Sequence, residues 1–280
     1  MRQIEAVAIT EAVGHLSQEA NFDLGGDVTA ALRRAVSEET SPLGKEALRI
    51  ILENAEIAHR ERIPLCQDCG TAILFLEIGQ DVHINGDLKA ALNEGVRKGY
   101  DEGLLRKSMV SHPFSTRTNT NTNAPPVIYV ELVPGDSFKI SLMAKGSGAE
   151  NKSRLVMLGP NAGKEGVINF VREVVDQADG DPCPPLVIGL GIGGTFDKAA
   201  YLAKRALLRP LGKPNDDPEL AELEAKALEE INRLGIGPLG IGGRFTALAV
   251  QAEAMATHIA SLPVAVNLQC HSIRHKEATL

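Results

Sequence analysis

The sequence predicts a mixed α/β fold of the α+β kind, with a helical N-terminal part followed by mixed sheets and packed helices. Apolar residues recur at helical spacing over much of the first hundred residues. From residue 127 onward, short apolar segments bounded by Pro and Gly alternate with further helical patterns. The 280 residues suffice for one large domain or two small ones. We expect one domain over 1–280, with possible subdomains at about 1–125 and 126–280.

The first strong helix signal is Ser41-Pro42, an N-cap followed by a proline at the first helical position. The apolar stripe that follows at helical spacing is Leu48, Ile51, Leu52, Ala55 and Ala58. Because Pro64 and Gly70 flank the next segment, we expect that segment to be a loop. A buried strand over 71–76 and a helix over 87–100 are expected next.

Residues 108–126 are polar, and their Thr and Asn residues favour turns because both side chains bond locally to the backbone. This stretch fits a solvated surface loop and a loop that lines a site equally well. Strands are expected at 127–132 and 138–143, and Pro134-Gly135-Asp136 between them predicts a hairpin. The remaining expected elements are helices over 164–178, 198–208 and 218–234, and strands over 185–191 and 264–268.

Composition and charge limit the classes of function. The formal net charge of −7 argues against a nucleic-acid partner, which would need a basic patch. No apolar run approaches the roughly 18 residues that span a membrane, and the N-terminus lacks the apolar core of a signal peptide. We therefore expect a cytoplasmic protein. In that reducing compartment, cysteines serve more often as ligands, nucleophiles or core residues than in disulfides.

The four cysteines are the strongest chemical signal in the chain. Cys66 and Cys69 lie close together beside an amide and a carboxylate, whereas Cys183 and Cys270 stand alone far downstream. This pattern suits an iron–sulfur cluster gathered by folding better than disulfides or a zinc knuckle. A redox pair, half of a zinc site and buried core thiols remain the alternatives. A cluster with three thiolate ligands would leave one iron open for chemistry.

Glycine-rich turns form a second group of signals. Lys145 and Gly146 begin a segment in which basic groups stand beside backbone N–H donors, a combination that suits a pocket for a small anion such as a dicarboxylate. The turns Gly191–Phe196 and Gly240–Phe245 resemble each other and could line a common site. Gly189–Gly194 departs from the Gly-x-Gly-x-x-Gly spacing of dinucleotide sites, so we interpret it as a tightly packed turn.

Several motifs follow one another from about Pro64 to the C-terminus: Cys66-Gln67-Asp68, Leu105-Arg106-x-Ser108, Ala144-Lys145-Gly146-x-Gly148-x-x-Asn151-Lys152, Gly235-Ile236-Gly237 and the segment from His258 to Cys270. In these motifs the chain resembles the class I fumarate hydratases. Its length resembles the α subunit of the two-subunit enzymes, and the related L(+)-tartrate dehydratase α subunit shares the same motifs. The resemblance implies a single iron–sulfur hydro-lyase α-type domain.

The resemblance also implies a [4Fe–4S] cluster held by Cys66, Cys183 and Cys270. The unliganded iron would act as a Lewis acid that binds the substrate's hydroxyl and an adjacent carboxylate, which helps hydroxide to leave. Cys69 stands where the family usually has a hydroxyl residue, and it would not bind iron. Asn121 replaces the glycine of the more usual Asn-Thr-Gly-x-Asn loop, and we expect a similar turn because Asn tolerates positive φ.

By the same resemblance, Gln67 and Arg106 would bind the substrate's carboxylate, and Gly146 would contribute backbone donors beside Lys145. Asp68 and His258 would form a polar pair that handles the proton of the leaving water. The base for the substrate's C3 proton is expected on another chain.

The resemblance thus predicts reversible hydration of fumarate to L-malate by an α subunit that requires a separate β subunit, arranged as a dimer of αβ pairs. Dehydration of L(+)-tartrate is the alternative within the same class. A non-catalytic subunit that carries a structural metal site is the alternative from another class.

Overall fold

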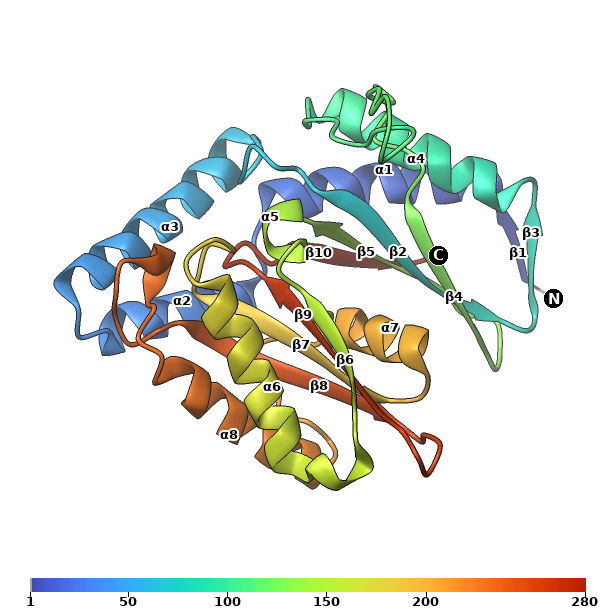
Figure 1. Ribbon diagram of the computed structural model, residues 1–280. Helices are drawn as coiled ribbons and strands as arrows, with labels where there is room; N and C mark the ends of the chain where they lie inside the picture. The colour runs from blue at the N-terminus through green and yellow to red at the C-terminus, as the bar shows by residue number, and fades with distance from the viewer. Residues whose placement is uncertain (1) are drawn as a thin grey trace. The chain divides into compact units, whose positions relative to one another are not determined.

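The computed structural model describes residues 2–280, which form two compact units (Figure 1). Unit 1 contains the described residues up to Gly25, together with Asn54–Ser147 and Arg274–Leu280. Unit 2 contains Gly26–Glu53 and Gly148–Ile273. The mixed α/β class expected from the sequence is confirmed. The expectation of a single catalytic domain stays a prediction.

Unit 1 is built on a four-stranded mixed sheet. Its strand order is β10 (His275–Thr279), β5 (Phe138–Lys145), β2 (Thr71–Gly79) and β4 (Val127–Val133). A parallel pair of short strands and two helices complete the unit: β1 (Arg2–Glu5), β3 (Val82–Asn85), α1 (Ala6–Phe22) and α4 (Leu88–Glu102). Helix α1 packs against α4, and apolar side chains of both helices share one core with β2 and β5.

The hairpin predicted around Pro134-Gly135-Asp136 is wrong, because β4 and β5 do not pair with each other. Strand β2 lies between them, parallel to β4 and antiparallel to β5. The turn reverses the chain as expected, but β2, whose residues Ala72–Leu76 are buried, takes the place between the two strands. The amides of Gly79 and Asp81 donate to carbonyls of the turn. A Cβ on Gly79 would collide with the Gly135 carbonyl, so the turn closes directly over the end of β2.

Unit 2 contains the second four-stranded sheet, in the order β6 (Arg154–Leu158), β9 (Leu262–Gln269), β7 (Leu186–Gly193) and β8 (Ala247–Met255). Only the β7–β8 pair is parallel. The other elements assigned to this unit are α2 (Gly26–Glu38), α6 (Gly163–Ala178), α7 (Phe196–Ala206), α8 (Pro218–Asn232), and the short helices η1 (Pro160–Ala162) and η2 (Pro238–Gly240). The unit boundaries divide α3 (Pro42–Glu61) at Asn54 and the one-turn α5 (Ser147–Glu150) after Ser147.

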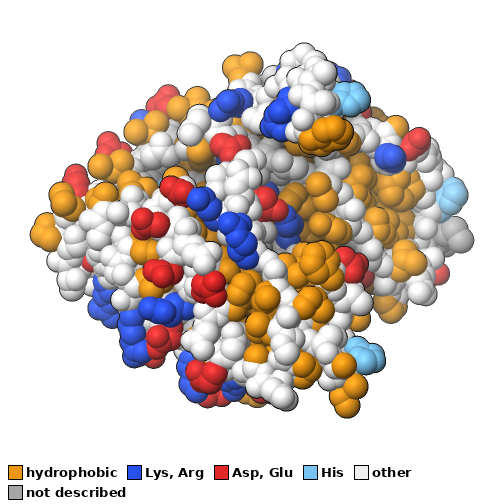
Figure 2. Space-filling view, viewed as in Figure 1, with side chains coloured by type: hydrophobic (Ala, Val, Ile, Leu, Met, Phe, Trp, Pro, Cys, Tyr) orange, Lys and Arg blue, Asp and Glu red, His pale blue; other side chains and the backbone are white. Residues whose placement is uncertain are grey.

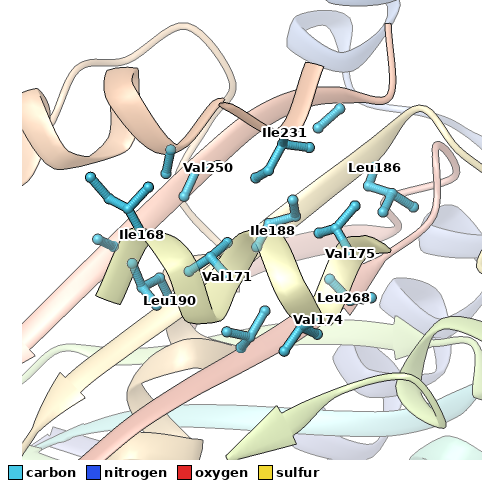
Figure 3. Close-up of a cluster of buried hydrophobic side chains, with 14 of the residues drawn as sticks. Ile168, Val171, Val174, Val175, Leu186, Ile188, Leu190, Ile231, Val250 and Leu268 are labelled. Carbon is cyan, nitrogen blue, oxygen red and sulfur yellow. The ribbon is translucent and has the colours of Figure 1, made fainter. Parts of the chain in front are cut away.

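Successive side chains of β7 point to opposite faces of this sheet, and helices cover both faces. Leu186, Ile188 and Leu190 point to the face covered by α6 and α8, where they join the cluster shown in Figure 3. Gly189 and Gly191 point to the other face, where α7 approaches so closely that a Cβ on either residue would collide with a helix carbonyl. The glycines of this strand therefore serve close packing, as predicted, but Gly189 and Gly191 lie within the strand and not in the turn that we expected.

The main expected elements are confirmed, with shifts at their ends. The strand expected over 71–76 extends to Gly79, and the helix expected over 87–100 is Leu88–Glu102, with the Asp87 side chain accepting from the Ala90 amide. The helix expected after Asp217 begins at Pro218 and is capped by the Asp217 side chain. The sequence did not identify β6, β8 and β10. Residues 245–270 lack one clear period, and β6 and β10 are five residues long.

Among residues 2–280, no helix is both long and apolar enough to cross a membrane. Some large hydrophobic side chains nevertheless reach the surface, and one face of the molecule in Figure 2 shows such side chains among charged ones. On strand β4, which is one of the two edge strands of its sheet, Val130 and Leu132 are exposed.

Candidate functional site

The segment from Cys66 to Gly70 connects α3 to β2 in unit 1 and has no regular secondary structure, as the flanking Pro64 and Gly70 predicted. Cys66 is partly exposed and Gln67 is exposed. The Cys66 thiol donates to Gln67 Oε1 at 3.3 Å and accepts from the Asp68 amide at 3.4 Å. Gly70 has φ of +76° and lies against the backbone of Ala144 and Lys145, where no side chain would fit. This close approach fixes the segment on the end of β5.

Both carboxylate oxygens of Asp68 accept hydrogen bonds from backbone amides. Gly70 N donates to Oδ1 at 3.0 Å, and Ser147 N donates to Oδ2 at 2.7 Å. Gly146, which precedes Ser147, is buried, and a Cβ at this position would lie 3.4 Å from Asp68 Oδ2. The structure thus brings together Asp68 and Gly146, two of the residues that the resemblance assigned to the site. The two amides hold the carboxylate in one orientation. Among the described residues, no cationic side chain forms an ion pair with it.

Lys145 is the last residue of β5 and pairs with Thr71 at the start of β2. Its side chain is only 2% exposed, and its ammonium lies 3.4 Å from the Gly146 carbonyl oxygen. The predicted basic group therefore lies beside the glycine turn, but under its surface. The Lys145 ammonium therefore places a buried positive charge next to the Gly146 backbone and does not extend into solvent.

Arg106 and Cys69 meet through the backbone. The Arg106 amide donates to the Cys69 sulfur at 3.2 Å, and the Arg106 side chain is exposed. Cys69 is 1% exposed and packs in the core of unit 1, and burial raises the pKa of its thiol. An inaccessible thiol that stays protonated is a poor ligand and a poor redox partner for Cys66. These surroundings support the prediction that Cys69 does not bind metal.

Two buried residues that sequence reasoning did not identify also hold this segment. Asn123 donates to the Gly70 carbonyl at 3.0 Å and accepts from the amides of Ser108 and Met109. The Tyr100 hydroxyl donates to the carbonyls of Cys69 and Gly70. Part of the polar stretch 108–126 is therefore tied to the candidate site. The Asn-rich motif was the available signal for Asn123, whereas nothing in the sequence singled out Tyr100.

Asn121 adopts φ of +57°, so the turn expected from the Asn-for-Gly replacement is confirmed. The Asn121 backbone amide donates to Oδ1 of Asn119 at 2.7 Å. Local polar bonding of this kind stabilises the left-handed conformation that Asn tolerates better than most residues.

In unit 2, Cys183 and Cys270 lie on neighbouring loops. His271, which follows Cys270, contacts the Cys183 carbonyl oxygen through its ring Nδ1 at 3.0 Å and through its amide at 3.4 Å. Cys183 is exposed and has φ of +56°, an uncommon conformation for a residue with a side chain. The Cys270 sulfur accepts from Gln269 Nε2 at 3.6 Å. The fold therefore gathers two of the three predicted ligands although they lie 87 positions apart in the chain.

His258 is exposed on the turn between β8 and β9 in unit 2, and its Nδ1 accepts from the Ala260 amide at 3.1 Å. It lines a surface pocket of about 550 Å³ together with Gly194 and Phe196. Asp68 belongs to unit 1, so the proposed pairing of Asp68 with His258 stays a prediction.

The two similar glycine turns do not line a common site. Gly191–Phe196 lies at the end of β7, whereas Gly240–Phe245 precedes the start of β8. Because β7 and β8 are parallel, the C-terminal end of β7 and the N-terminal start of β8 lie at opposite ends of this strand pair. The second turn is held by Glu39, whose carboxylate accepts from the Arg244 and Phe245 amides.

Within residues 2–280, no three His, Cys, Asp or Glu side chains gather closely enough to hold a metal ion. Cys66 belongs to unit 1 and the other two predicted ligands to unit 2. The surroundings of each thiol nevertheless fit iron–sulfur ligation. All three are accessible to some degree, and the sulfurs of Cys66 and Cys270 accept N–H···S hydrogen bonds, which stabilise cluster thiolates.

In unit 1, the accessible thiol of Cys66, a fixed carboxylate and a buried lysine form a candidate enzyme site, and their chemistry suits the hydro-lyase class. Comparison with known proteins supports that class, since the family model described as fumarate hydratase (fumerase) matches residues 10–279. The chain belongs to this family, which confirms the resemblance inferred from the motifs.

Similar proteins carry a related name. A protein of Methanocaldococcus jannaschii named "Putative L(+)-tartrate dehydratase subunit alpha" is 45% identical over 273 residues, covering 95% of each chain. The L(+)-tartrate dehydratase subunit alpha of Escherichia coli UTI89 is 32% identical over 274 residues, covering 97% of this chain and 90% of the relative. The same subunit of strain K12 is 31% identical.

Proposed function

We propose that this chain is the α subunit of an iron–sulfur-dependent hydro-lyase that interconverts fumarate and L-malate. The observation that carries the proposal is the convergence in unit 1 of Gln67, Asp68, Lys145 and Gly146 on the segment that also bears Cys66. An oriented carboxylate, an exposed amide and a buried cation beside a glycine turn suit a small hydroxy-dicarboxylate. The resemblance assigns the same four residues to the site.

Cys66, Cys183 and Cys270 are the proposed ligands of a [4Fe–4S] cluster. When bound, the cluster supplies a Lewis acid that makes hydroxide a better leaving group. The chain contributes the thiolates and their N–H donors, Asp68 N to Cys66 and Gln269 Nε2 to Cys270.

The remaining proposed roles belong to side chains that reach the surface. Gln67 and Arg106 are exposed and bind substrate carboxylate, Gln67 through its amide and Arg106 through its guanidinium. Asp68 and His258 hold and deliver the proton of the leaving water. Asp68 suits this role because two amides fix its carboxylate, so no reorientation accompanies proton transfer.

L(+)-tartrate is the second candidate substrate, and a specific observation favours it. Relatives with 45% and 32% identity over nearly the whole chain carry the name L(+)-tartrate dehydratase subunit alpha. Tartrate differs from malate by one hydroxyl group. The subunit that completes the site is proposed to carry the residues that distinguish the two substrates.

The relatives' designation as alpha subunits supports the proposal that this chain acts with a β subunit, as a dimer of αβ pairs. The test is to purify the chain anaerobically, alone and with its co-expressed partner, and to assay fumarate, L-malate and L(+)-tartrate. We expect broad iron–sulfur absorption and turnover of one of these substrates by the pair only. Full turnover by the α chain alone would contradict the subunit requirement. A colourless zinc protein would instead support the non-catalytic subunit with a structural metal site.

A further inference from the structure

Arg274 has the largest fully buried side chain in the described part of the molecule, and only 1% of its surface is exposed. It opens the C-terminal segment of unit 1, just before β10. Its Nη1 donates to Asn21 Oδ1 at 3.0 Å and to the Asp68 carbonyl oxygen at 2.7 Å. Both acceptors are neutral, so the positive charge is buried against dipoles and not against a carboxylate.

The surroundings of Arg274 leave part of its hydrogen-bonding capacity unused. Within residues 2–280, its Nε has no hydrogen-bond partner. Burying a guanidinium without a carboxylate costs free energy, because the lost hydration is repaid only in part by neutral acceptors. A core serving stability alone would be better filled by an apolar side chain of similar length. The arrangement therefore points to a role other than stability.

The buried guanidinium lies next to two residues of the candidate site in unit 1, Asp68 and Gly146. Arg274 Nη2 and Asp68 Oδ2 are both 3.4 Å from the point that a Cβ on Gly146 would occupy. Asn21, whose Oδ1 is the other acceptor of Nη1, accepts from the Leu65 amide through its backbone carbonyl and donates through Nδ2 to the Ser17 carbonyl. Arg274 thus links helix α1 to both ends of the Cys66–Asp68 segment.

We propose that Arg274 is a positioning residue for Asp68, a role that rests on the proposed function. Its hydrogen bond fixes the Asp68 carbonyl, and this sets the direction in which the carboxylate leaves the backbone toward the amides of Gly70 and Ser147. Its buried charge also favours the negative charge of Asp68 Oδ2 beside Gly146, although the two groups form no ion pair.

The test uses the α subunit co-purified with its β partner and three variants, Arg274→Met, Arg274→Gln and Arg274→Lys. We expect Arg274→Met to lower kcat for malate dehydration at least 100-fold, with a smaller change in KM. Arg274→Lys, which keeps the charge and one donor, should recover at least tenfold of this loss. The control is Arg62→Gln, since Arg62 is an exposed arginine of unit 1 paired with Glu19, and its kcat should stay within twofold.

Hydrogen exchange of the Gly70 and Ser147 amides in the α chain gives a readout independent of turnover. In Arg274→Met these two amides should exchange at least tenfold faster, while amides in the middle of β2 and β5 keep their protection. A kcat within threefold of wild type together with unchanged exchange at Gly70 and Ser147 would overturn the proposal. A uniform increase in exchange throughout unit 1 would overturn it as well, because a purely structural residue acts that way.

If Arg274→Met does not fold, the same comparison of local and uniform exchange is made with Arg274→Gln and Arg274→Lys. If the wild-type pair turns over none of the three substrates, the proposed function fails. The exchange at Gly70 and Ser147 still decides whether Arg274 positions Asp68.

Discussion

The amide of Ser147 donates a 2.7 Å hydrogen bond to Oδ2 of Asp68, although 79 residues separate the two in the chain. This bond joins the segment before β2 to the turn after β5, and the Gly70 amide occupies the other carboxylate oxygen. A carboxylate held this way needs little reorganisation when it accepts or delivers a proton.

The first prediction concerns this carboxylate. Asp68→Asn keeps an oxygen acceptor for one of the two amides but removes the charge and the ability to take a proton. We expect kcat of the αβ pair to fall by about 10² to 10⁴, the range typical of a lost general acid–base group. Steady-state kinetics measures the loss. A kcat within threefold of wild type would remove Asp68 from the mechanism.

The second prediction separates Cys66 from Cys69. Cys66→Ser should abolish activity and cluster absorption, because an accessible ligand is lost. Cys69→Ser should reduce either by less than about threefold, because a hydroxyl can still accept from the Arg106 amide and donate to the Cys66 carbonyl. Iron content and the visible spectrum of the anaerobic protein provide the measurement. Equal loss from both variants would mean that both thiols bind the cluster.

The third prediction is a pH effect at Glu39 in unit 2. Although its burial opposes ionisation, the amides of Ser41, Arg244 and Phe245 donate to its carboxylate and hold the pKa of Glu39 below its usual value. A lowered carboxyl pKa stabilises the fold at pH values above the unfolded pKa, and this stabilisation is lost as pH falls through the folded pKa. We therefore expect Glu39→Gln to lower the free energy of unfolding at pH 7 by about 1–3 kcal/mol.

Urea unfolding at pH 7, 5 and 4 tests this expectation. The difference between wild type and Glu39→Gln should shrink as the pH falls, because the wild-type advantage requires the charged carboxylate. Glu46→Gln is the matched control, since Glu46 is an exposed glutamate of unit 2 whose ion pair with Arg49 contributes little. A difference that stays constant with pH would show that shape, and not charge, matters at Glu39.

The fourth prediction concerns the close contact of β7 with α7. Gly189→Ala and Gly191→Ala would drive a Cβ into the carbonyl oxygens of Ala203 and Ala199, so either should destabilise the protein by about 3 kcal/mol or more. Gly159→Ala is the control, because nothing lies within 4 Å of its Cβ position and its φ of −67° suits alanine. Its unfolding midpoint should match wild type, and a similar loss in all three variants would refute the packing argument.

Local signals in the sequence predicted the elements whose causes are local. The Asp217 cap and Pro218 mark the start of α8, and the amphipathic stripe before Ala58 forms α3. The positive φ of Asn121 followed from the residue type that replaces glycine there. In each case the deciding interaction lies within a few residues along the chain.

Local signals did not predict which strands pair with each other or which residues lie next to the site residues. The turn Pro134-Gly135-Asp136 predicted that β4 and β5 would pair, but β2, from a distant part of the chain, lies between them and pairs with both. The resemblance assigned Asp68 to the site and did not indicate that Arg274, 206 residues away, lies behind it.

The sequence by itself therefore determined the fold class and the family, and its motifs supplied the site residues that we propose, since residue types and their spacing carry that information. Only the tertiary structure decided that Cys69 is buried while Cys66 is accessible, that two amides fix Asp68, and that an arginine without a carboxylate partner lies behind it. The reason is physical. Burial and hydrogen-bond partners depend on which segments meet in space, and contacts between distant segments leave no local pattern in the chain.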